Sequence, residues 1–202
     1  MAKVAHLIGN GKSAALYEPA KGMKVVCNIP PFHVENVYTT VMVDFKMMNA
    51  IAKGEIDVPG DWVLGARPKK FMEMNNKFYV QRAQQIKQFY TVLPKYCANY
   101  TDFNCGHMAL HYIANELKRD EIHMYGFDSL FGFDITSTSD LILNSDRENM
   151  NTQRLTSKWR PIFRGIFEEF KNTKFVLYHH KGELFLPKKP DNVEVVIRKQ
   201  KK

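Results

Sequence analysis

The chain has 202 residues, of which 45% are hydrophobic and 25% charged, which predicts one ordinary globular domain spanning 1–202. No apolar run approaches the roughly 20 residues that cross a bilayer, so we expect no membrane span. The N-terminus also lacks the apolar region and cleavage site of a signal peptide, and we expect a cytoplasmic protein. Three widely spaced cysteines without a pairing motif predict reduced thiols.

The net charge is +8, and Lys and Arg are densest at the C-terminal end. Such a balance attracts nucleic acid, acidic membranes or anionic small molecules, or it only keeps the protein soluble. A nucleic-acid partner would need basic residues interleaved with aromatic side chains on one face. Residues 67–82 hint at that pattern, but acidic and apolar residues interrupt it, so we do not favour nucleic acid. We expect the basic end, 198–202, to be a solvated tail.

In chain order, strand-like and helix-like segments alternate. Short apolar or β-branched runs predict strands at 4–8, 24–28, 38–44, 61–66, 121–128, 174–179 and 193–198. Helical patterns occur at 13–19, 45–54, 78–89, 106–119 and 158–172, and 90–93 reads as a further strand option. The polar region 129–157 has weak periodicity and is predicted to be an excursion or lid.

This alternation predicts right-handed βαβ units and therefore a Rossmann-like α/β fold with a mostly parallel sheet flanked by helices. Ligands of such sheets bind at the carboxyl ends of the strands. The residues to watch are those that follow predicted strands, namely Gly9–Gly11, Asn28, Asp44 and 126–128.

The stretch 4–17, VAHLIGNGKSAALY, fits three phosphate-binding patterns. As a P-loop it fails, because the position that requires another glycine holds His6. GNGKSA satisfies the dinucleotide pattern G-x-G-x-x-G/A, but the second strand ends in Asn28 instead of the acid that binds the ribose of NAD. The third pattern is a GNG turn with an asparagine after the second strand.

LIGNGKSA…KVVCNIPPF resembles the start of the bacterial family 42 sialyltransferases and of the related DUF115 (MptE-like) proteins. VMVDF is similar to the third strand of that superfamily. FNCGHMALHYIANELKRDEIHMYGFD is similar to its later segment, in which a Ser/Gly turn opens a helix and the next strand ends in G-x-D. The resemblance covers residues 4–46 and 103–128. It implies a transferase that binds a nucleotide or nucleotide sugar, for example a CMP-linked donor, together with an acceptor that it does not identify.

The resemblance places Asn10 and Asn28 on the nucleotide, and an amide can both donate to and accept from a ribose or a base. Asp44 falls where sialyltransferases carry Asn and DUF115 proteins, whose members transfer a diphosphate to a pterin, carry Asp. It would accept a hydrogen bond from a ribose hydroxyl or help to hold a divalent cation. The resemblance is compatible with a divalent cation but does not require one. The other matched residues are Asn104, Cys105 and Gly106 in the Ser/Gly turn and Asp128 in G-x-D.

Gly9 and Gly11 permit close backbone approach, and the amides of Gly11, Lys12 and Ser13 are expected near phosphate at the start of the next helix. Lys12 and Arg154 are the candidate cations for leaving-group charge. The family's histidine base lies in the lid, yet 129–158 contains no histidine. Substitutes are Asp134, Asp140, Asp146 and Glu148 in the lid, or the pair His179 and His180. We predict Asp44, Asp128 and His180 as the catalytic residues.

Several of these residues also allow a structural interpretation. The GNG turn can be a tight turn without a ligand, Asn28 can cap the turn into the next prolines, and Asp44 and Asp128 can cap a helix and a turn. We expect His107 and His111 to be surface or half-buried residues, because HMALH lacks the glutamate of a zinc motif. The prediction is a nucleotide-binding transferase. The alternatives are a non-catalytic nucleotide-binding or sequestering protein and, less favoured, a basic nucleic-acid-binding protein.

Overall fold

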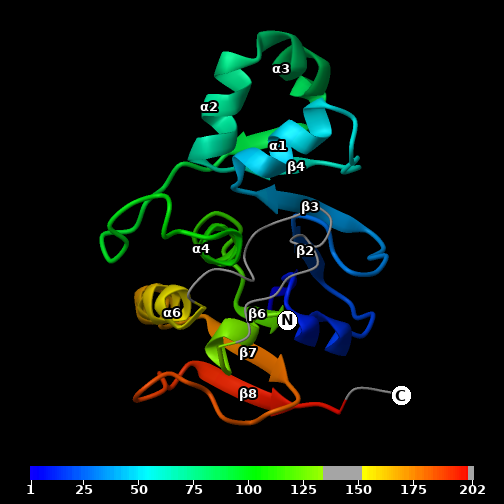
Figure 1. Ribbon diagram of the computed structural model, residues 1–202. Coiled ribbons are helices and arrows are strands. Elements are labelled where there is room, and N and C mark those ends of the chain that lie inside the picture. Colours follow the sequence, from blue (N-terminus) through cyan, green and yellow to red (C-terminus); the bar gives the residue numbers. More distant parts are fainter. Residues whose placement is uncertain (134–151, 200–202) are drawn as a thin grey trace.

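A computed structural model describes residues 1–133 and 152–199, the side chains of 152–154 excepted. It contains an 8-stranded sheet in the order β5-β4-β3-β2-β1-β6-β7-β8, and every neighbouring pair is parallel (Figure 1). The strands are β1 Val4–Ile8, β2 Met23–Cys27, β3 Val37–Met42, β4 Trp62–Leu64, β5 Ile86–Phe89, β6 Glu121–Tyr125, β7 Lys174–His179 and β8 Val193–Ile197. The predicted Rossmann-like α/β fold is confirmed. None of the described helices is both long and apolar enough to span a membrane.

Helices cover both faces of the sheet, because successive side chains of a strand point to opposite faces and those of central strands such as β1 and β3 are buried on both. The helices are α1 Phe45–Ala52, α2 Ala66–Met74, α3 Asn76–Arg82, α4 Cys105–Asn115 and α6 Thr152–Glu169, with short 3-10 turns η1 Lys12–Leu16, η2 Ala83–Gln85 and η3 Asp128–Leu130. On one face α4 and α6 share a core with β1, β2, β3, β6 and β7. On the other face α1, α2 and α3 pack over β3 and β4. Figure 1 shows these three helices gathered at the β4 side of the sheet.

The chain reverses direction across the sheet next to β1. It adds β2, β3, β4 and β5 toward one edge, and α4 then carries it back to β6, which pairs with β1. The β1 and β6 tips are tied together, since Gly9 N–H donates to Tyr125 O at 2.7 Å. A Cβ on Gly9 would lie 2.9 Å from the Gly126 carbonyl oxygen, so this approach requires glycine. In open α/β sheets a crevice opens at such a reversal point, outside the carboxyl ends of the strands.

Two predicted elements are corrected. Residues 78–89 are helical only as far as Arg82, and 86–89 form the edge strand β5, because pairing with β4 outweighs the local helix propensity. The strand option 90–93 is not a strand.

The lid and the tail also differ from expectation. Helix α6 begins at Thr152, so the last part of the predicted lid 129–157 is helix. Its candidate bases Asp134, Asp140, Asp146 and Glu148 lie outside the described residues. The expected solvated tail starts later than predicted, since Arg198 donates to Leu16 O at 2.8 Å and its guanidinium lies 4.4 Å from the Tyr178 ring. Residues 200–202 lie outside the described part of the chain.

Candidate functional site

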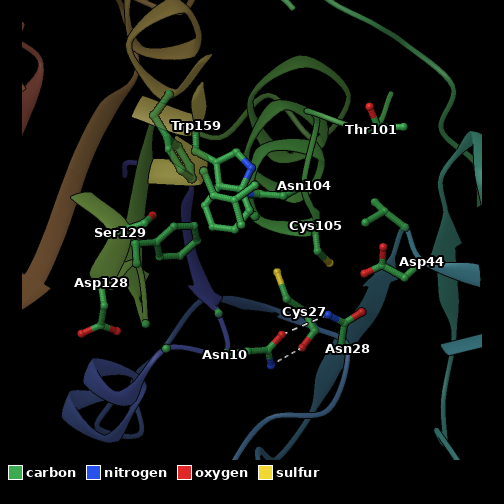
Figure 2. A pocket seen from close by; sticks show the side chains of 18 of the residues that line it. Asn10, Cys27, Asn28, Asp44, Thr101, Asn104, Cys105, Asp128, Ser129 and Trp159 are labelled. Atoms are coloured by element: carbon green, nitrogen blue, oxygen red, sulfur yellow. Dashed lines mark hydrogen bonds between the residues drawn. The ribbon is translucent and has the colours of Figure 1, made fainter. Parts of the chain in front are cut away.

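A cavity of about 320 Å³ opens at the carboxyl ends of β1, β2, β3 and β6 (Figure 2). The ends of these strands and the segments after them line it with Gly9, Asn10, Gly11, Cys27, Asn28, Val43, Asp44, Gly126, Phe127, Asp128 and Ser129. Helices and the segments before them add Arg67, Thr101, Asn104, Cys105, Gly106, Leu155, Trp159 and Phe163. The structure thus brings most predicted site residues together. The predicted residues that do not line the cavity are Lys12, Ser13 and His180.

An asparagine pair forms the floor of the cavity. Asn10 Nδ2 donates to two carbonyl oxygens, that of Cys27 at 2.8 Å and that of Ile29 at 2.9 Å. Asn10 Oδ1 accepts from Asn28 Nδ2 at 3.1 Å, as the dashed lines in Figure 2 show. Both hydrogens of the Asn10 amide point to carbonyls, so its orientation is fixed by its partners. The orientation of Asn28 is fixed in turn, and its Oδ1 must face away from Asn10.

Asn28 Oδ1 is a buried acceptor without a hydrogen-bond partner among the described residues. The residue is 7% exposed and adopts a left-handed backbone conformation, with φ of 50°. A buried unpartnered acceptor costs roughly 1–3 kcal/mol, so it calls for an explanation. Capping of the next turn is not that explanation, because within the described residues the only hydrogen bond of this side chain goes to Asn10. A ligand N–H or O–H in the cavity would supply the missing donor.

Asp44 occupies the N-cap position of α1, but its side chain makes no capping hydrogen bond. Its Oδ1 instead accepts from Arg67 Nη2 at 2.8 Å, and about a third of each side chain is exposed. Arg67 stands near the start of α2 and is the only cation among the described residues that line the cavity. It was missed in the sequence, although its place just after β4 was a usable signal. Of the two predicted cations, Lys12 is exposed and the side chain of Arg154 lies outside the described part.

Asp128 folds back onto the glycine turn. Its Oδ2 accepts from Ser13 N–H at 3.1 Å and from Ser13 Oγ at 2.9 Å, and its Oδ1 accepts from His179 Nε2 at 3.0 Å. His179 Nδ1 accepts from Lys181 N–H, so the ring hydrogen lies on Nε2 and points to Asp128. The side chain of Asp128 is only 11% exposed, and a carboxylate of the protein itself therefore sits at this turn.

These contacts correct two predictions. The amides of Gly11 and Ser13 were expected near ligand phosphate, but Gly11 N–H donates to Gly126 O and Ser13 N–H to Asp128. The catalytic histidine was expected to be His180, but its side chain is exposed and stacks on His179 with ring centroids 4.3 Å apart. His179 is the histidine that contacts Asp128, and neither ring lines the cavity.

The start of α4 forms the upper wall. Asn104 caps this helix, since its Oδ1 accepts from His107 N–H at 2.9 Å while His107 Nδ1 accepts from Asn104 N–H. His107 Nε2 then donates to Trp159 O at 3.0 Å and so fixes the aromatic wall. Burial lowers the pKa of His107 to about 3, so the ring is neutral. His107 and His111 are both buried, which corrects the expectation of surface or half-buried histidines.

Two thiols, of Cys27 and Cys105, also line the cavity. Cys105 Sγ donates to Val41 O at 3.0 Å, and burial raises the pKa of this thiol. A protonated buried thiol is a poor nucleophile, so Cys105 supplies polarisable surface and not covalent chemistry.

A divalent metal does not fit the residues present. Within 1–133 and 152–199, no three His, Cys, Asp or Glu side chains gather to hold a metal ion. The two carboxylates of the cavity already have partners, since Asp44 pairs with Arg67 and Asp128 with Ser13 and His179.

The cavity is chemically divided. Asn28 and Asp44 offer acceptors, Arg67 offers a cation, and Phe127, Trp159 and Phe163 form an aromatic wall.

Comparisons of the chain with models of protein families, with curated proteins and with solved structures found no match. They leave the family resemblance of residues 4–46 and 103–128 untested.

Proposed function

We propose that the chain binds a nucleotide or nucleotide sugar in this cavity and acts as a transferase on it. The observation that carries the proposal is the buried, unpartnered Oδ1 of Asn28 in a cavity at the reversal point of a parallel sheet. A cavity with an aromatic side and a few fixed polar groups is typical of small-molecule sites. The resemblance to family 42 sialyltransferases and DUF115 proteins supports the same class of ligand.

A nucleotide matches the groups present. Its amino or hydroxyl donors suit Asn28 Oδ1 and the Asp44 carboxylate, and its planar base suits the side chains of Phe127, Trp159 and Phe163. In the transfer, a hydroxyl of the acceptor attacks the donor, its proton passes to a carboxylate, and the bond to the departing nucleotide breaks. Asp44 and Asp128 are the only carboxylates among the described residues that line the cavity, and they remain the proposed catalytic residues.

One observation favours a second candidate, a protein that binds or sequesters a nucleotide without turning it over. Asp44 is held by Arg67, Asp128 accepts three hydrogen bonds, and no histidine appears among the described residues of the cavity wall. Both carboxylates are thus already engaged in hydrogen bonds, and His179, which contacts Asp128, is not among the described residues that line the cavity. Such a protein would bind the nucleotide and release it unchanged.

A thermal-shift panel of CMP, CDP, UDP, GDP and ATP, each with and without Mg²⁺, tests binding. A ligand at 100 times its Kd stabilises the native state by about 2.7 kcal/mol, which raises the Tm by roughly 5–10 °C for a chain of this size. If none of them raises the Tm, the proposal fails. For a nucleotide that binds, incubation of its sugar conjugates with a panel of acceptors separates the two candidates, because only a transferase releases free nucleotide faster than buffer does.

A further inference from the structure

We propose that Arg67 receives the anionic group of the ligand, so that the phosphate lies toward α2 and not at the glycine turn. This inference rests on the proposed function and adds to it the direction in which a nucleotide lies in the cavity. It reverses the arrangement expected of a glycine-rich turn after β1, where phosphate normally sits.

The glycine turn already holds an anion, the carboxylate of Asp128. The Asp128 carboxylate accepts from Ser13 N–H, Ser13 Oγ and His179 Nε2, and these are the donors that a phosphate would need. A Cβ placed on Gly11 would overlap Asp128 Oδ2, which shows how closely the carboxylate approaches the turn. Two unit charges about 4 Å apart repel by roughly 4 kcal/mol at an effective dielectric constant near 20. A ligand phosphate at this turn would therefore be opposed by Asp128.

Most of the N–H donors of Arg67 have no hydrogen bond within the described part of the chain. Its guanidinium has five N–H donors in a planar fork, and within the described part of the chain its one hydrogen bond runs from Nη2 to Asp44 Oδ1. An ion pair exposed to this extent contributes about 0–1 kcal/mol, so Asp44 orients the fork without saturating it. The unused edge suits the two oxygens of a phosphate, which Arg binds in a bidentate manner.

The two carboxylates of the cavity lie far apart. Asp44 follows β3 and Asp128 follows β6, and the sheet order β3-β2-β1-β6 separates them by three steps between strands, roughly 14 Å in all. Figure 2 shows the two carboxylates on opposite sides of the cavity, with Asn10 and Asn28 between them. Arg67 and Asn28 line the same cavity, so a nucleotide whose phosphate contacts Arg67 has the Asn28 acceptor available to its sugar or base. The ligand class is a nucleoside carrying a 5′-phosphate or diphosphate.

Isothermal titration with matched ligands tests this. The probes are cytidine with CMP and adenosine with AMP, titrated into the wild-type protein, Arg67→Gln, Arg67→Lys, Lys12→Gln and the control Lys69→Gln. Lys69 lies on the same helix, is exposed and pairs with Glu73 outside the cavity. Urea unfolding of each variant confirms that the fold is retained.

We expect Arg67→Gln to weaken binding of the monophosphate about 10- to 100-fold and to leave binding of the nucleoside within about threefold. Arg67→Lys keeps the charge but not the fork and should fall between, and Lys69→Gln should match the wild type. The inference is overturned if Arg67→Gln weakens nucleoside and nucleotide equally, if it weakens neither, or if Lys12→Gln at the glycine turn produces the selective loss instead. In those cases the wild type still binds nucleosides, so the proposed function stands. Failure of the wild type to bind any probe overturns both.

Discussion

Replacement of Asn28 by glycine should separate stability from binding. The change removes a buried acceptor that has no partner among the described residues, which raises the free energy of unfolding by about 1–3 kcal/mol. It also relieves a left-handed backbone conformation, which raises it by about 1 kcal/mol. It loses one hydrogen bond to Asn10, about 1 kcal/mol, and adds the backbone entropy of glycine, about 0.5–1 kcal/mol. We therefore expect Asn28→Gly to be between about 0 and 2.5 kcal/mol more stable than the wild type, yet to bind nucleotide at least about tenfold more weakly.

A matched control isolates the backbone part of this effect. Asn36 has φ of 54°, is exposed and does not line the cavity. Asn36→Gly therefore reports the relief of the left-handed backbone alone, and the difference between the two variants reports the side chain. Urea unfolding and nucleotide titration of both variants measure the two quantities. A loss of more than about 2 kcal/mol in Asn28→Gly relative to Asn36→Gly would mean that Oδ1 is satisfied in the free protein, and the reasoning would be refuted.

Three further changes test the supports of the site. Since burial lowers the pKa of His107 to about 3, the unfolded state alone takes up this proton as pH falls below 6.5. Stability should thus drop by about 2 kcal/mol more between pH 7.5 and pH 5.0 in the wild type than in His107→Gln, and equal drops in urea unfolding would contradict this. Asp128→Asn turns an N–H₂ group toward one of the donors on Ser13 or His179 and should lower the free energy of unfolding in urea by about 2–3 kcal/mol. The half-exposed control Asp61→Asn should lower it by less than about 1 kcal/mol. Similar losses in the two variants would argue against the contact of Asp128 with three donors. Gly9→Ala places a Cβ against the Gly126 carbonyl and should lower the free energy of unfolding by more than about 2 kcal/mol. A Cβ on Gly132 meets no atom of the described residues within 4 Å, so the control Gly132→Ala should change it by less than about 0.5 kcal/mol. A tolerated Gly9→Ala would show that the β1–β6 tips can separate.

The sequence was most informative where local pattern decides the structure. Alternating apolar strands and amphipathic helices predicted the parallel sheet, and residues just after β1, β2, β3 and β6 were correctly expected to share one edge. Asn10, Asn28 and Asp44 therefore meet in one cavity. These predictions worked because the carboxyl ends of parallel strands necessarily lie on the same side of the sheet.

The errors arose where the order or the register of strands decides the contact. Asp128 reaches Ser13, 115 residues away, because β6 pairs with β1, and chain order alone does not give that neighbour. Which of His179 and His180 contacts Asp128 depends on where β7 ends, a matter of one residue. Arg67 was overlooked because the short β4 was expected to run past its actual end at Leu64, which hid α2.

A crystal structure of the protein with a saturating nucleotide tests the central claim most directly. We expect ligand density in the cavity, with a ligand N–H or O–H about 3 Å from Asn28 Oδ1 and the phosphate on the Arg67 side. Nucleotide bound elsewhere on the protein, with Asn28 Oδ1 still without a donor, would contradict it.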